Sequence, residues 1–202
     1  MEMFRSTKDG GVSGWLSAGE AQMLRALVGP VMELLGGDAS RPGESTSPNV
    51  GASPKAGTGD AAVLDELERM LGDTVPDTPE TPQDPVLARL LPDGYQDDPE
   101  AAGEFRKYTE SSLREAKKYF AQVMLDTLPE NGGRIHLTGD QARDWMRALN
   151  DVRLMFGVRL EVTEDFEEQL AALDPEDPAV PVFEVYGWLG AVQESLVQAL
   201  VR

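Results

Sequence analysis

The stretch that decides the fold is residues 138–157, TGDQARDWMRALNDVRLMFG. Thr138 and Gln141 form a capping-box pattern, in which the threonine oxygen accepts the third helical N–H and the glutamine reaches back to the cap. Apolar side chains then recur at spacings of three and four residues, which places them on one helix face; they are Ala142, Trp145, Leu149, Val152 and Phe156. The pattern predicts a helix with one buried face that ends at Gly157.

A longer helix is predicted upstream, over residues 99–128. Asp98 can cap its start and Pro99 suits the first helical position, after which nothing interrupts the helix until Leu128. Its apolar side chains recur near a seven-residue repeat and are expected to face the core; they are Phe105, Leu113, Ala116, Phe120, Val123, Met124 and Leu128. This would be the long central helix of the fold.

The remaining segments also have helical periodicity. A second capping box at residues 17–20 begins a helix that Gly29-Pro30 should bend or split. A short acidic helix is expected over 163–173, and a final helix follows Pro181. Residues 134–137 form only a brief extended segment, and no continuous strand pattern is found. The sequence therefore predicts an all-α helical bundle of about five to six helices.

Two segments have the composition of flexible linkers. Residues 36–59 are almost entirely Gly, Ser, Pro, Ala and Thr, and residues 73–85 combine four prolines with four acids. Such segments bury too little apolar surface to offset their ordering entropy. Between them, residues 60–71 are expected to form a short amphipathic helix. We therefore predict one helical domain over residues 1–202, interrupted by disordered linkers at 36–59 and 73–85.

Composition excludes much catalytic chemistry. The 202 residues include 36 acids against 18 bases, one histidine and no cysteine, for a net charge of -18. There is no thiol to act as a nucleophile, and one imidazole, His136, cannot build a two-histidine metal site. We therefore predict no catalytic, cofactor-binding or metal-binding residues. The absence of a long apolar run and of an export signal favours a cytoplasmic protein with no membrane association.

The charge distribution points to a protein partner. Residues 103–159 hold 10 bases and 8 acids, whereas residues 160–202 hold one base and 10 acids. So acidic a chain repels polyanions, which disfavours direct nucleic-acid binding and favours regulation through another protein. Two alternatives stay open. The helices of 103–159 could bind DNA directly, or paired carboxylates could serve an uncharacterised carboxylate-dependent hydrolase.

A polar cluster on two of the predicted helices is the candidate site. It comprises Asn150, Asp151, Arg153, Arg159, Trp188, Gln193 and Glu194. Asn and Asp weaken helix interiors unless a contact compensates. One interpretation is structural, with Arg147 pairing with Asp151 and the glutamine or glutamate of the last helix pairing with the arginines. The other is a contact surface for a partner.

Four stretches carry a family resemblance: RLLPDGYQDDPE at 89–100, EFR at 104–106, WMRALNDVRLMFGVRL at 145–160 and WLGAVQESLVQAL at 188–200. Together they resemble an uncharacterised actinobacterial family of domains of unknown function. The resemblance implies no established enzymatic activity, genes near the ClpS protease adaptor, and members labelled oxidative-stress transcriptional regulators. It implies partners in the transcription or Clp proteolysis machinery. A thiol switch cannot operate in a sequence without cysteine, and a homodimer stays open.

Overall fold

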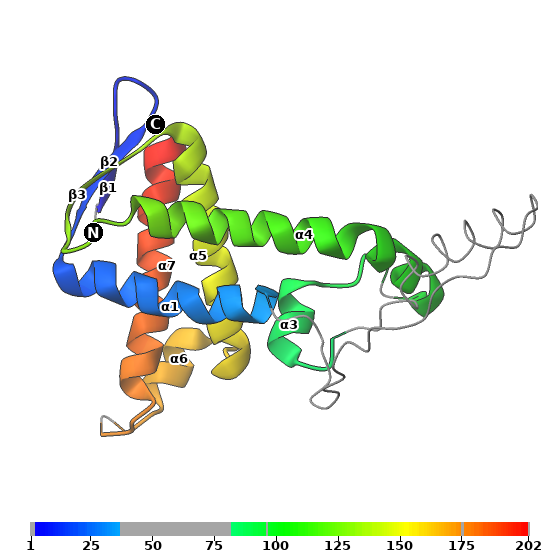
Figure 1. The fold of residues 1–202 in the computed structure, drawn as a ribbon. Coiled ribbons are helices and arrows are strands. Elements are labelled where there is room, and N and C mark those ends of the chain that lie inside the picture. Colours follow the sequence, from blue (N-terminus) through cyan, green and yellow to red (C-terminus); the bar gives the residue numbers. More distant parts are fainter. Residues whose placement is uncertain (1–2, 37–81, 96, 175, 202) are drawn as a thin grey trace, which may run out of the picture.

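The computed structural model describes residues 3–36, 82–95, 97–174 and 176–201. Over these ranges the chain forms six helices and three short strands (Figure 1). In chain order the elements are β1 (Phe4–Ser6), β2 (Val12–Leu16), α1 (Ala18–Gly36), α3 (Pro85–Leu90), α4 (Pro99–Thr127), β3 (Gly133–Leu137), α5 (Gly139–Arg159), α6 (Phe166–Ala171) and α7 (Val180–Val201). The predicted helical fold class is confirmed, and the sheet is an addition to it.

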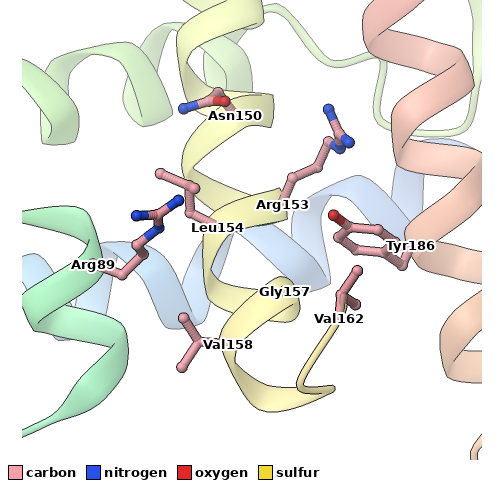
Figure 2. A pocket seen from close by; sticks show the side chains of 8 residues that line it. All are labelled: Arg89, Asn150, Arg153, Leu154, Gly157, Val158, Val162 and Tyr186. Atoms are coloured by element: carbon pink, nitrogen blue, oxygen red, sulfur yellow. The ribbon is translucent and has the colours of Figure 1, made fainter. Parts of the chain in front are cut away.

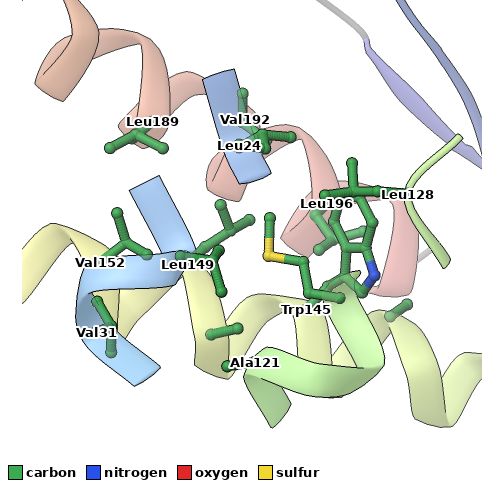
Figure 3. Packing of buried hydrophobic residues seen from close by; sticks show 14 of the residues in the cluster. Leu24, Val31, Ala121, Leu128, Trp145, Leu149, Val152, Leu189, Val192 and Leu196 are labelled. Carbon is green, nitrogen blue, oxygen red and sulfur yellow. The ribbon is translucent and has the colours of Figure 1, made fainter. Parts of the chain in front are cut away.

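Helix α5 lies at the centre of the packing. It contacts α4 and α7 most extensively, and also α3 and α1. Helices α5 and α7 run side by side, α1 and α4 cross them, and the small sheet covers one end (Figure 1). One apolar cluster joins all of these elements, with Trp145, Leu149 and Leu196 fully buried within it (Figure 3).

The predicted capping box of α5 is present. Thr138 Oγ1 accepts the amide of Gln141 at 3.2 Å, and Gln141 Oε1 accepts the amide of Thr138 at 2.9 Å. Four of the five predicted core residues are buried, whereas Phe156 is only half-buried and Met155 takes the buried position instead. The helix runs past Gly157 to Arg159, because one glycine costs only about 1 kcal/mol in a helix held by packing.

The predicted face of α4 is wrong in its N-terminal half. Phe105 is 47% exposed and Leu113 is also exposed, while Arg106 is 5% exposed. This half projects beyond the other described helices, and none of them lies opposite for an apolar stripe to cover (Figure 1). Arg106 is instead held by the carboxylates of Asp93 and Glu110 and by the carbonyl of Leu91, at 3.2 Å from the last. A heptad-like pattern predicts burial only where a partner helix exists.

The extended segment predicted at residues 134–137 is part of strand β3, whereas β1 and β2 were not predicted. Strands β1, β2 and β3 form an antiparallel sheet in that order. Its inward side chains, Phe4, Val12, Leu16, Ile135 and Leu137, are all buried. At Gly14 a Cβ would lie 2.7 Å from the Phe4 ring, so glycine makes room for the ring. Strands of three and five residues are too short to give a clear alternating pattern.

Helix α1 is continuous through Gly29-Pro30, so this pair does not split the helix. Val28 and Val31, on either side of the pair, are both buried, and this packing offsets the hydrogen bond that proline cannot donate. Most of the predicted linkers 36–59 and 73–85, and the whole predicted helix at 60–71, lie outside the described residues. Asp84, within the second linker, caps α3 by accepting the amide of Val86 at 2.7 Å.

A buried serine joins the two ends of the described chain. The backbone amides of Met3 and Phe4 both donate to Ser195 Oγ, each at 2.9 Å. Ser195 is itself buried on α7, so water cannot replace these bonds. The serine therefore fixes β1, and with it the sheet, against the last helix.

We expect Ser195→Ala to lower the free energy of unfolding by about 2 kcal/mol, because it leaves two buried amides without an acceptor. Urea unfolding followed by circular dichroism measures the loss. Ser111→Ala, at an exposed position of α4, is the matched control and should change stability little. Equal stability of the two variants would contradict the role given to Ser195.

Candidate functional site

The structure separates the predicted polar cluster into several environments. Arg153 and Gln193 meet across α5 and α7, with Arg153 Nη1 donating to Gln193 Oε1 at 2.6 Å. Asn150 is exposed one turn before Arg153. Arg159 and Glu194 are exposed, and Glu194 accepts a bond from Gln198 at 2.9 Å. Trp188 is half-buried against the core.

Asp151 faces α4 instead of the cluster. It is buried, and its carboxylate accepts a bond from Lys117 Nζ at 2.6 Å. Burial raises the pKa of Asp151, because desolvation outweighs the opposing effect of the bond and charge of Lys117. The expected pair of Arg147 with Asp151 is wrong: Arg147 pairs with Asp144 at 3.0 Å. Helix spacing predicted a local partner, whereas the actual partner of Asp151 comes from another helix.

The basic side chains of α4 are largely used inside the protein. Lys117 is paired with Asp151, and Arg114 donates to Glu110 at 2.8 Å. Hydrogen bonds from Arg106 and Arg114 hold the pKa of Glu110 below its usual value, against the desolvation that would raise it. These cations stabilise the packing of α4, so this helix does not present them as a free row to a DNA backbone.

A pocket of about 380 Å³ lies along the C-terminal half of α5, between α3 and α7 (Figure 2). Arg89 comes from α3, Tyr186 from α7, and Val162 from the turn after α5. The face of α5 supplies Asn150, Arg153, Leu154, Gly157 and Val158. None of the eight lining residues is acidic, although acids outnumber bases two to one in the chain. Two members of the predicted cluster, Asn150 and Arg153, therefore line one pocket.

The outer face of the sheet forms a second hollow, of about 710 Å³. Outward side chains of neighbouring strands line it, because alternate residues of a strand point to opposite faces. Trp15 is 62% exposed and lies in register with Arg134, while Ser13 lies in register with His136. The adjacent strand β1 adds Arg5. The sequence patterns did not predict this site, because strands of three and five residues show no clear alternation.

His136 lies on this face and within 3.5 Å of the exposed carboxylate of Asp9. Over the described ranges no three His, Cys, Asp or Glu side chains lie close enough together to hold a metal ion. Within the same ranges no helix is both long and apolar enough to span a bilayer.

Fold and surfaces define a small helical protein with a minor sheet and two hollows free of acidic lining. The family model for a domain of unknown function, DUF2017, matches residues 1–200, and the chain belongs to this family. The oxidative stress regulator AosR of Mycobacterium tuberculosis is 35% identical over 199 residues, covering 92% of this chain and 80% of the relative. A relative from Mycobacterium leprae is 37% identical over 195 residues, covering 90% and 79%. No solved structure matches the chain significantly.

The buried pair on α4 and α5 gives a pH-dependent prediction. Lys117→Met leaves the buried carboxylate of Asp151 without its counter-charge, and we expect a loss of about 3 kcal/mol at pH 7. Because the pKa of Asp151 is raised on folding, the protonated form of this carboxyl favours the folded state. This contribution to stability is present in acid and is lost as pH rises through the folded pKa. The deficit of the variant should therefore shrink between pH 7 and pH ~4.5.

Urea unfolding at both pH values measures this change. Lys118→Met removes a half-buried neighbour with no ion pair to a described residue, and serves as the control. A deficit in Lys117→Met that does not change with pH would contradict the assignment.

Proposed function

We propose that this chain is a non-enzymatic regulatory protein that acts in the cytoplasm by binding another protein, in the response to oxidative stress. The two relatives carry the words oxidative stress regulator in their names and align with this chain over 80% and 79% of their own length, which supports the setting. The outer face of the sheet supports the mechanism. We take the partner to be a component of the transcription or proteolysis machinery.

The observation that carries the proposal is Trp15. Its indole is 62% exposed in a hollow that is also lined by arginine, and aromatic and arginine side chains are enriched at protein interfaces. Trp and Arg dominate the residues that contribute most binding energy at protein interfaces, and here Arg134 lies directly across the strand pair from Trp15. The lining residues are neutral or basic, so the partner surface should be apolar at its centre with acidic groups around it.

A protein partner is favoured over DNA for a physical reason. The net charge of -18 opposes approach to a polyanion, and the α4 cations that could offset it are partly engaged in ion pairs. We therefore expect that the wild-type chain gives no salt-dependent gel shift with DNA. Charge reversal at Arg114, Lys117 and Lys118 should then change only the stability of the protein. The hydrolase alternative is disfavoured because the pocket of about 380 Å³ between α3, α5 and α7 has no carboxylate in its lining.

The test is a pull-down from host lysate at physiological salt, with bound proteins identified by mass spectrometry. The wild-type chain should retain a transcription or proteolysis component. We expect Trp15→Ala to reduce its recovery by about tenfold or more, because interface tryptophans contribute on the order of 2 kcal/mol. The purified partner then allows the dissociation constants of both forms to be compared by calorimetry.

Tyr119→Ala is the matched control, since it removes an aromatic side chain that is 60% exposed on α4, away from the sheet. It should bind as the wild type does. The proposal fails if the lysate yields no such component, or if Trp15→Ala and Tyr119→Ala bind equally well.

A further inference from the structure

Arg153 is held by neutral groups alone within the described part of the chain. Gln193 Oε1 accepts its Nη1 at 2.6 Å, and Gln193 is itself fixed because its Nε2 donates to the carbonyl of Met146 at 3.2 Å. The Tyr186 ring lies below the guanidinium, 5.4 Å from ring centre to Cζ. The Nε atom of Arg153 is buried without a hydrogen-bond partner. The arginine is thus oriented by its surroundings but not neutralised by them.

The buried cations of α4 have carboxylate partners. Arg106 pairs with Asp93 and Glu110, and Lys117 pairs with Asp151. Arg153 lies on the same central helix as Asp151, in a chain with 36 acidic residues, and still has no such partner in the described ranges. A half-buried guanidinium with a fixed geometry and no counter-charge is suited to bind an anion, because its planar donors match carboxylate and phosphate oxygens.

The pocket around Arg153 provides the rest of such a site. Arg89 brings a second positive charge from α3, and Figure 2 shows Arg89 and Arg153 on either side of Leu154. Asn150 and the Tyr186 hydroxyl add neutral hydrogen-bonding groups at the edges. Leu154, Val158 and Val162 form an apolar floor. The volume of about 380 Å³ falls in the range of small-molecule pockets.

We propose that this pocket binds a small organic anion, with a carboxylate or phosphate group held by Arg153, an apolar body over Leu154 and Val158, and the positive charge of Arg89 adding attraction from the other side of Leu154. The ligand would bridge α3, α5 and α7, so its binding would couple three helices of the bundle. This site is separate from the sheet face, and it stands or falls independently of the protein-binding proposal.

Titrations of the full ¹⁵N-labelled chain test the proposal, with ¹H–¹⁵N spectra as the readout. The probes are benzoate, phenyl phosphate and benzylamine, which share a ring and differ in the charged group. We expect benzoate or phenyl phosphate to shift the amides of Gly157 and Val158 and the Nε–H of Arg153, with affinity in the millimolar range or tighter. Benzylamine should leave these signals unchanged.

Two variants then locate the anion. Arg153→Lys keeps the charge but loses the planar donors, and should weaken the binding of whichever anion binds by about tenfold. Arg89→Gln, at an exposed position, should weaken it by about threefold or more without affecting the fold. Arg143→Gln removes an arginine from the first turn of α5, outside the pocket, and should bind as the wild type does. If Arg153→Lys alters signals throughout the spectrum, the substitution has changed the fold, and the affinity of Arg89→Gln alone then tests the proposal.

Three results would overturn the proposal. The first is no shift with either anion up to about 20 mM. The second is an equal response to benzylamine, which would show an apolar pocket with no preference for charge. The third is unchanged affinity in Arg89→Gln together with unchanged affinity in a folded Arg153→Lys. If the first result is found, binding of the acidic peptide hexaglutamate would show that the surface binds polyanions instead of a small molecule.

Discussion

The structure depends on the burial of a single helix, α5, along most of its circumference. Trp145, Leu149 and Val152 are enclosed by α1, α4 and α7, and the Trp145 indole still satisfies its one donor by bonding Thr127 Oγ1 at 2.7 Å. Asn150 is exposed and Leu154 and Val158 are only partly buried on the side of α5 that lines the pocket. The pocket is therefore a direct result of the way the core is packed.

The packing of the helices also determines where charged side chains lie. Where cations are buried between helices, as at Arg106 and Lys117, carboxylates accompany them, because an isolated buried charge is costly. Residues 160–202 hold 10 acids and one base, and nearly all of these acids are exposed, whereas the pocket and the outer face of the sheet have no acidic lining. An acidic protein thus presents two surfaces that are lined by neutral and basic side chains only, and these are its candidate sites.

Local sequence signals predicted what local physics determines. Capping boxes and spacings of three and four residues located α1, α5 and α7, and Asp98-Pro99 located the start of α4. Strands β1 and β2 were missed because they are short and β1 is held by a serine 191 residues away. The site was predicted only in part, since Lys117–Asp151 and Arg153–Gln193 join different helices across 34 and 40 residues. No spacing within one helix reveals such pairs.

The bonds from the amides of Met3 and Phe4 to Ser195 also determine when the sheet can reach its final position during synthesis in the cell. At ribosomal rates of about 5–20 residues per second, the serine is synthesised roughly 10–40 s after the strand that it holds. During that interval β1 lacks the docking site that α7 provides, and the contact closes one of the largest loops that the chain can form. The sheet therefore acquires its final position only after α7 has been synthesised, and until then Phe4 lacks the acceptor that Ser195 provides.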